Sequence, residues 1–332
     1  MIKVLIVHPH ADSQADGIRS HCNTLYHIFK ENKDIRVIKP ENYPYFKNRL
    51  FNGVFKFRVL CRSIKDSGAD IVHVHGYTTL QVAQAMLAAA MCRKIVIYSP
   101  HWHPFFELRR PLFAKVFFNV LIVPLIRRCV TYIICINKED SSYMQRFNKP
   151  VFTFPHCLKE EMSPAEMSPS MNNNSKKRIL FVGRFDASNK GIEYLWHLPE
   201  GKYDIHLVGK GSIEPRSDMI IHQNIPEPEL LEQYLRSDIV VIPSQYEAFS
   251  LVALEALSVG TPVVMSDKVR IADYLENVDG VKVFRYGDYD GFREAVESGL
   301  DLKVDMDKIH RIFSRDVIQQ EYADMYEHAV NS

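Results

Sequence analysis

The sequence has few of the features that mark secreted, metal-binding or membrane-spanning proteins. It contains six cysteines in 332 residues, and no two of them form a Cys-x-x-Cys pair. Scattered thiols in apolar surroundings are typical of a reducing compartment, so we expect free, buried cysteines and a cytoplasmic protein. Met1 leads straight into the apolar run Ile2–Val7, and we therefore expect no signal peptide.

Long apolar runs are also lacking. Val116–Ile126 is 11 residues long and contains Pro124, whereas a membrane-spanning helix needs about 20 apolar residues. Residues 105–128, like residues 36–65, combine aromatic with basic side chains. Two interpretations fit: a basic amphipathic surface that lies on anionic lipid, or a half-buried core helix with a solvated basic face. Since no helix-turn-helix, zinc or RNP-type pattern is present, we expect no nucleic-acid partner.

What the composition does contain is enough apolar sequence for two globular domains. Apolar residues make up 46% of the chain and charged residues 24%, which is typical of a soluble globular protein. The net charge is +1, but it is unevenly spread. Residues 1–150 hold 22 Lys and Arg against 10 Asp and Glu, while residues 151–332 hold 19 against 30. We therefore expect the first half, at +12, to meet an anionic partner.

Short apolar runs alternate with helical patterns along the chain, which predicts an α/β protein with doubly wound parallel sheets. A polar segment rich in Ser, Pro and Asn separates the two halves. We predict a first domain over 1–157, a linker over 158–177, a second domain over 178–315 and a terminal helix over 316–332.

One strand-to-helix loop of the second half carries two cations. Gly183 and Arg184 end a predicted strand, and Lys190 follows Arg184 after six residues. Arg offers a planar fork and Lys a point charge, so the two side chains can reach the same pair of phosphates. In the first half, Gly17 lies where the first strand-to-helix loop turns and where the absence of a Cβ lets backbone approach a ligand.

The stretch 239–266 contains the main candidate binding residues of the second half. It reads as a buried strand, a polar turn, a short helix and a second buried strand, with Glu247 and Glu255 eight residues apart. Open α/β sheets bind ligands beyond the carboxyl ends of their strands. The helix start at Ser250 and Leu251 offers N–H groups and a positive dipole that suit a phosphate.

The histidines suggest a metal site, but their pattern disfavours one. His73 and His75 alternate on a strand, and we expect them to point to opposite faces. The same holds for His101 and His103 in an extended segment. No acidic residue or cysteine stands at ligand spacing beside them, so we predict no metal site.

Two Asp-x-Asp pairs match a pattern that binds metal-bound nucleotide sugars. They are Asp288-x-Asp290 and Asp305-x-Asp307. Both pairs stand at predicted helix starts in acidic segments, where acidic side chains complement the helix dipole. We interpret them as helix caps.

Together the motifs resemble the family 4 retaining glycosyltransferases of the GT-B fold, over nearly the whole chain. The strongest match is Glu-x7-Glu, formed by Glu247 and Glu255 inside PSQYEAFSLVALEALSVGTPVV. VGRFDASNKG is similar to the family's GR…KG loop, LVGKGS to its second glycine turn and FPHCL to its hinge. HVHG and YSPH are similar to less specific family segments. The resemblance implies two Rossmann-like domains that face each other across a cleft.

The resemblance also implies catalytic roles. Arg184 and Lys190 would hold the diphosphate of a nucleotide sugar, and Glu247 would contact the hydroxyls of the transferred sugar. His101 would lie at that sugar from the first domain. The transfer would be retaining and metal-independent, with no cofactor beyond the nucleotide-diphosphate sugar that serves as donor.

Further residues would bind the donor. Glu255 would hold the ribose, and the base would lie against backbone near Ile225. Backbone groups at the remaining positions would approach the sugar and the phosphates: Gly17, Gly183, Phe249, Ser250 and Leu251. Ser250 stands where the family often has glycine, His156-Cys157 replaces Asn-Gly at the hinge, and only one glycine marks the first loop.

The acceptor is inferred from the basic first half. We expect a lipid-linked or saccharide acceptor, as in surface-polysaccharide or lipopolysaccharide biosynthesis, and a peripheral contact with anionic lipid on the inner face of the cell membrane. Two alternatives remain. One is a nucleotide-sugar epimerase or hydrolase of the same fold, and the other is a non-catalytic partner subunit that binds the donor.

Overall fold

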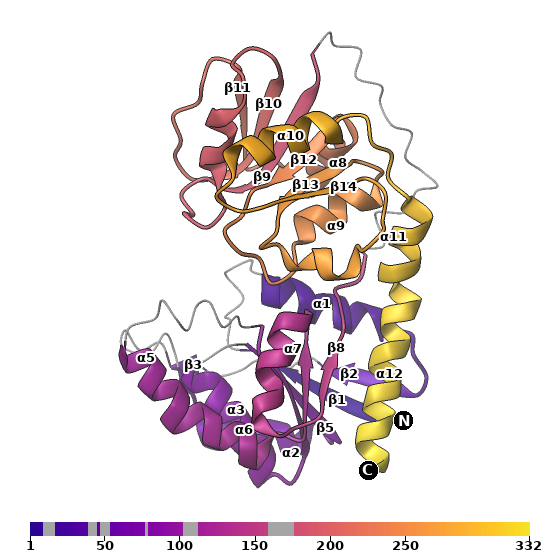
Figure 1. Ribbon diagram of the computed structural model, residues 1–332. Coiled ribbons are helices and arrows are strands. Elements are labelled where there is room, and N and C mark those ends of the chain that lie inside the picture. The colour runs from indigo at the N-terminus through magenta and orange to yellow at the C-terminus, as the bar shows by residue number, and fades with distance from the viewer. Residues whose placement is uncertain (9–16, 39–44, 47–53, 77–78, 102–111, 159–175) are drawn as a thin grey trace. The chain divides into compact units, whose positions relative to one another are not determined.

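The protein is described here by a computed structural model. The residues that it describes are 1–8, 17–38, 45–46, 54–76, 79–101, 112–158 and 176–332. These residues form two compact units: residues 1–157 together with 315–332, and residues 158–314. Each unit contains a parallel sheet of six strands (Figure 1). Most of the predicted linker, His103 and the loop that precedes Gly17 lie outside the described residues.

The sheet of the first unit has the order β2-β1-β5-β6-β7-β8. Its strands are short apolar runs that are buried on both faces, as expected of a parallel sheet covered by helices. Their bounds are β1 (Ile2–Val7), β2 (Ile35–Ile38), β5 (Ile71–His75), β6 (Ile95–Ser99), β7 (Tyr132–Cys135) and β8 (Val151–Thr153).

Helices cover both faces of this first sheet. On one face, side chains such as Leu5 and Val72 pack against α2 (Phe57–Asp66), α3 (Leu80–Met91) and α6 (Val123–Cys129). On the other face, Val4, Ile6 and Ile71 pack against α1 (Gly17–Ile28) and α12 (Arg315–Asn331). The period of two along each strand therefore decides which helices a side chain meets.

Three smaller elements complete the first unit. α7 (Lys138–Met144) follows β7, and α5 (Leu112–Phe117) continues through a π-helical turn over Phe118–Ile122 into α6. The two-residue strands β3 (Tyr45–Phe46) and β4 (Val54–Phe55) form a separate antiparallel pair. Phe118, Ile122 and Ile126 of the α5–α6 segment are buried, whereas Val116 and Val120 are exposed.

The sheet of the second unit has the order β11-β10-β9-β12-β13-β14. The sequence order of its strands runs 3-2-1-4-5-6, which is the order of dinucleotide-binding sheets. Their bounds are β9 (Arg178–Arg184), β10 (Asp204–Lys210), β11 (Met219–Gln223), β12 (Ile239–Ile242), β13 (Val263–Ser266) and β14 (Val281–Phe284). Two doubly wound parallel sheets confirm the predicted fold class.

The helices of the second unit also lie on two faces. α10 (Tyr289–Gly299) and a 3-10 helix over Ile192–His197 contribute Phe292 and Tyr194 to one core cluster. On the other side, α9 (Leu251–Ser258) packs against α8 (Glu227–Leu235) and α11 (Met306–Phe313). A second 3-10 helix, Arg270–Tyr274, follows β13.

Candidate functional site

The second unit brings its candidate residues together at one point of the sheet. The strand order reverses between β9 and β12, and open α/β sheets bind ligands beyond the carboxyl ends of strands at such a reversal. The loop after β9 carries Lys190, and the loop after β12 carries Glu247. A backbone hydrogen bond from Gln245 N–H to the Asn189 carbonyl, 2.8 Å long, joins the two loops.

Glycine is required at Gly191, in the loop after β9, and at Gly209, in β10. A Cβ on Gly191 would lie 1.9 Å from the Pro243 carbonyl oxygen, and its φ of +68° is a glycine conformation. A Cβ on Gly209 would lie 1.7 Å from the Gly183 carbonyl oxygen. At Gly183 itself a Cβ would meet only ordinary contacts, 3.4 Å from the Phe181 ring. Internal packing therefore explains the first two glycines but not Gly183.

Lys190 and Glu247 form an ion pair although 57 positions separate them in the chain. The Lys190 Nζ donates to Glu247 Oε1 over 2.8 Å, and the Ser244 hydroxyl donates to the same oxygen over 2.7 Å. The Glu247 backbone is fixed as well, because its N–H donates to Lys268 and its carbonyl accepts from Arg270. The Lys190 side chain stays 26% exposed and Glu247 12% exposed. A charged pair that is partly open to solvent can exchange partners when a ligand arrives.

The helix after this turn begins under backbone strain. Ser250 is the N-cap of α9, and its hydroxyl accepts from the Ala253 N–H over 3.3 Å. Its φ of +126° lies in the region that favours glycine. The resemblance had marked this position as one where glycine is common, and the backbone here is indeed of the glycine type. The side chain of Phe249 is buried, so this residue offers a ligand its backbone only.

Glu255 lies one turn into α9 and has a partner that the sequence analysis did not name. The Tyr234 hydroxyl, on α8, donates to Glu255 Oε2 over 2.9 Å. Tyr234 is fully buried, and burial together with the Glu255 carboxylate raises the pKa of its phenol well above 10. The phenol therefore stays a donor at physiological pH and holds the carboxylate in one orientation. The only sequence signal was an aromatic residue on the neighbouring helix.

Two predicted donor-binding residues of this unit are not joined to the ion pair. Arg184 Nε lies 3.3 Å from Asp186 Oδ1 on its own loop, and both side chains are exposed. Ile225 follows β11 in a turn where Asn224 adopts a left-handed conformation, with φ of +56°. Arg184 is the last residue of β9 and Ile225 follows β11, and β10 lies between these two strands.

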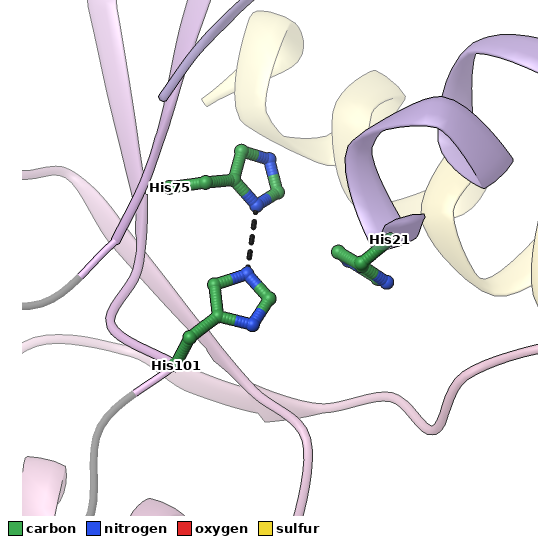
Figure 2. A group of neighbouring side chains, drawn as sticks. All are labelled: His21, His75 and His101. Atoms are coloured by element: carbon green, nitrogen blue, oxygen red, sulfur yellow. Dashed lines mark hydrogen bonds between the residues drawn. The ribbon is translucent and has the colours of Figure 1, made fainter. Parts of the chain in front are cut away.

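The first unit places two other candidates at its own strand ends. Gly17 is the first residue of α1. His101 follows β6 with a φ of +44°, and its Nε2 lies 3.0 Å from His75 Nδ1. Figure 2 shows these two rings facing each other, with His21 beside them.

The structure contradicts the prediction that His73 and His75 point to opposite faces. Their ring centroids lie 3.9 Å apart. The prediction was wrong because residues two apart on a strand share a face; it is adjacent residues that alternate. Both rings therefore lie on the α1 and α12 face, and burial lowers the pKa of each, to about 3 for His73.

The predicted helix caps are confirmed. The Asp288 side chain accepts from the Gly291 N–H and caps α10, and Asp305 accepts from the Lys308 N–H and caps α11. The six cysteines are free thiols, each buried or half-buried. In the part of the chain that the structure describes, no helix is both long and apolar enough to cross a membrane.

Comparison with known proteins agrees with the geometry of the second unit. A family model described as glycosyl transferases group 1 matches residues 176–301. This match lies within the second unit, which is therefore similar to the family. The range that matches the group 1 glycosyltransferases contains Arg184, Lys190, Glu247 and Glu255.

An uncharacterised 41.2 kDa protein in the cps region of Klebsiella pneumoniae is 24% identical over 246 residues, which cover 67% of this chain and 66% of that protein. The chain spans about two thirds or less of the first three curated relatives that it matches.

Solved structures of similar shape cover the whole chain. A sucrose-phosphate synthase from Thermosynechococcus elongatus has 16% sequence identity and a TM-score of 0.70, with 98% of each chain covered. HepE from Anabaena, solved with UDP-glucose, has 14% identity and a TM-score of 0.70, with 99% of this chain and 100% of that chain covered. These likenesses show that the chain has the GT-B fold.

Proposed function

We propose that this protein transfers a sugar, with retention of its anomeric configuration, from a nucleotide-diphosphate sugar to a hydroxyl acceptor. The observation that carries the proposal is the Glu-x7-Glu unit. Glu247 is paired with Lys190, and Glu255 is oriented by Tyr234, at the point where the sheet order reverses. The family model matches this same segment. The UDP-glucose bound to HepE supports a nucleotide sugar as the class of donor.

The diphosphate is assigned to three features of the second unit. Lys190 and Arg184 supply positive charge from the loop after β9, and the first turn of α9 supplies backbone N–H groups with the positive end of a helix dipole. On donor binding, the Lys190 ammonium exchanges the Glu247 carboxylate for phosphate oxygens. Glu247, still held by Ser244, then accepts hydrogen bonds from hydroxyls of the sugar. Glu255 accepts from the ribose hydroxyls while Tyr234 fixes its second oxygen.

The reaction breaks the bond between the anomeric carbon and the terminal phosphate oxygen. The acceptor oxygen forms the new bond on the same face of the sugar, and its proton passes to the departing phosphate. The transition state has oxocarbenium character beside a leaving group of growing negative charge. Lys190, Arg184 and the α9 N-terminus lie where that charge grows, so they stabilise it electrostatically without a metal ion.

His101 remains a proposed contact of the donor sugar, on the family resemblance alone. The approach of the Gly17 backbone to the donor is proposed on the same ground. The two alternatives have less support. An epimerase or hydrolase needs a base directed at water or at the sugar ring, whereas Glu247 is engaged by Lys190 and Ser244. A non-catalytic subunit would be expected to lack part of the set, yet all four of Arg184, Lys190, Glu247 and Glu255 are present.

We further propose an acceptor at an anionic membrane, in surface-polysaccharide or lipopolysaccharide assembly. The first half of the chain carries a charge of +12. On the α5–α6 segment, Val116 and Val120 are 51% and 71% exposed, and Arg127 and Arg128 are exposed near its end. Apolar and basic side chains on one helical segment suit the surface of an anionic bilayer. The relative encoded in a cps region supports a saccharide product.

A thermal-shift screen of nucleotide sugars tests the donor, because a ligand of the folded state raises the unfolding temperature. We expect one nucleotide sugar to give the largest shift, and a smaller shift from the matching nucleoside diphosphate. The same donor with candidate lipid-linked acceptors should give a product heavier by one sugar residue. NMR of the first-formed product reports its anomeric configuration. An inverted product, or donor hydrolysis at the same rate with and without acceptor, would contradict the proposal.

Flotation with vesicles tests the membrane contact separately. Binding to vesicles that contain anionic lipid should be lost at high salt and reduced in V116S/V120S. Equal binding to neutral vesicles, or none to either kind, would leave a soluble saccharide as the acceptor.

A further inference from the structure

Five histidines gather on the α1 and α12 face of the first sheet, and three of them form a set with the spacing of metal ligands. His21 lies on α1, His75 ends β5 and His101 follows β6. One ring nitrogen from each lies within 4.8 Å of the other two (Figure 2). His75 and His101 therefore stand at the carboxyl ends of neighbouring strands, next to the point where the first sheet reverses its order between β1 and β5.

The separations suit a tetrahedral ion. Zinc binds imidazole nitrogen at about 2.0–2.1 Å, so two ligand nitrogens of a tetrahedral site lie about 3.3 Å apart. His75 Nδ1 and His101 Nε2 are already 3.0 Å apart. His21 offers a ring nitrogen within 4.8 Å of the other two and must move closer to complete a three-histidine site whose fourth position is left for water.

The surroundings of the three rings provide supporting contacts for a metal site. His21 Nδ1 lies 2.8 Å from His156 Nδ1, and the Tyr322 hydroxyl lies 3.3 Å from His21 Nε2. Such contacts can orient a metal-bound imidazole through the ring nitrogen that does not bind the ion. An ion bound to His21 takes the place of one of these two contacts, and the other contact then holds the ring. His73, whose nitrogens lie 2.9 and 2.8 Å from Tyr326 and Ser99, is outside the three-histidine set.

One atom of the cluster is left unsatisfied. His75 is fully buried, and its Nε2 has no hydrogen-bond partner among the described residues. A buried polar atom without a partner is costly, and here it indicates a place for a bound water, because the nitrogen of His75 that faces His101 is Nδ1 and not Nε2.

We propose that His21, His75 and His101 bind a divalent transition-metal ion, with zinc as the best match to three imidazoles. The prediction from sequence that no metal site exists rested partly on the opposite-face argument for the histidines, which the structure contradicts. The ion joins α1, the end of β5 and the segment after β6. It is distinct from the donor chemistry of the second unit, whose phosphate-binding groups are Lys190 and Arg184.

The test uses the full chain without a histidine tag, stripped with a chelator and titrated with zinc against a competing chromophoric chelator. We expect one ion per chain and a rise of the unfolding temperature on zinc addition. Cobalt in place of zinc should give the visible absorption of a tetrahedral site. H101A, which removes the ligand that is least buried, should weaken binding at least about 100-fold, beyond the effect typical of losing a second-shell partner.

Two further variants keep the outcome decisive. H21Q tests a second ligand if H101A alone is ambiguous. H222A is the matched control, because His222 and His206 form a comparable pair of rings, 2.8 Å apart, in the second unit. The proposal would be overturned if wild type bound zinc no more tightly than H101A, or if H222A lost as much zinc affinity as H101A. The cluster would then be a hydrogen-bonded network of neutral histidines.

One consequence rests on the proposed function. If the donor sugar contacts the same His101 nitrogen that zinc binds, zinc should slow glycosyl transfer and a chelator should restore it. Because ion binding is measured without any donor, failure of the glycosyl-transfer assay would leave the metal site testable.

Discussion

The two units carry different chemistry at the same place in their folds. Both sheets are parallel, and both present their candidate residues at carboxyl strand ends near a reversal of strand order. In the second unit those residues are charged and partly open to solvent, as in the Lys190–Glu247 pair. In the first unit they are buried histidines, with pKa values lowered mainly by desolvation. Fixed charge suits a diphosphate, which is common to all such donors, whereas neutral imidazoles suit hydroxyls or a metal ion.

This contrast also explains where the family match lies. It covers residues 176–301, all within the second unit, where the phosphate and ribose impose one arrangement of charges. The first unit is proposed to meet the acceptor, whose chemistry differs from one transferase to another. Experiments that report on each unit by itself therefore test the proposed roles more directly than a measurement of overall activity does.

The largest effect is expected from K190A. Removing one preorganised donor to developing negative charge typically costs about 10²–10³ in rate. K190A should therefore lower kcat by that factor at saturating donor. K202A removes an exposed lysine of the same unit that pairs with Glu297, and it should leave kcat unchanged. Equal kcat values for K190A and wild type would show that Lys190 does not stabilise the leaving diphosphate.

The second prediction concerns acid stability. The pKa of His73 is lowered to about 3 and that of His156 to about 4, whereas an unfolded histidine titrates near 6.5. Between these values the unfolded chain binds more protons, so stability is complete above pH 6.5 and falls as the pH drops toward 4. Each such group contributes up to about 1.4 kcal/mol per pH unit.

The first unit should therefore open before the second as the pH falls. In the second unit the pKa of His206 is lowered to about 4 and that of His222 is also lowered, so it has fewer such groups. Hydrogen exchange of the chelator-treated protein at pH 7 and pH 5, corrected for intrinsic rates, should show a greater loss of protection in β5 and β6 than in β9 and β12. An equal loss in the two sheets would refute the comparison.

A smaller effect is expected from Y234F. Without the phenol, the Glu255 carboxylate loses one hydrogen bond and its fixed orientation, a change of about 1.5 kcal/mol. The KM for the donor should rise by roughly tenfold while kcat changes little. Y194F is the control, because it removes a buried hydroxyl that accepts from the Gly287 N–H elsewhere in the unit. Y194F should lower stability without changing KM. If Y234F and Y194F had the same KM and kcat, Tyr234 would not position Glu255.

The smallest effect is expected from S250G. Relief of the strained φ should outweigh loss of the side-chain cap, which costs only a few tenths of a kcal/mol for glycine, so S250G should gain about 0.5–1 kcal/mol in unfolding free energy. S258G, at the last residue of α9, also removes a hydroxyl that donates to the Glu255 carbonyl, and it should instead lose about 0.5–1 kcal/mol. Chemical denaturation measures both, and destabilisation by S250G would show that its backbone is not strained.

Much of the fold could be predicted from the sequence, and the failures have physical causes. Apolar runs such as Ile2–Val7 identified strands, and the predicted caps at Asp288 and Asp305 were confirmed. The edge strands β2 and β11 were not predicted, because each is short and interrupted by polar residues. The helix expected after Lys190 is a 3-10 helix, Ile192–His197, that follows a left-handed glycine.

The candidate site was predicted as a set of residues, whose binding roles stay predictions, but its contacts could not be predicted. The sequence spacing identified Glu247, Glu255 and Lys190, yet only tertiary structure shows that Lys190 meets Glu247. Tyr234 was missed because its contact with Glu255 joins two helices and leaves no local pattern. The histidine cluster was missed through a wrong assignment of strand faces, and its third member, His21, comes from a helix 54 positions away from His75.

The most direct test of the central claim is calorimetric binding of a nucleotide sugar and of its nucleoside diphosphate to wild type, E247Q and E255Q. If Glu255 holds the ribose and Glu247 the sugar, E255Q should weaken both ligands to a similar extent. E247Q should weaken the nucleotide sugar but not the nucleoside diphosphate, whose binding no longer requires Lys190 to leave a carboxylate. Unaltered affinity for both ligands in both variants would contradict the assignment of the Glu-x7-Glu unit to the donor.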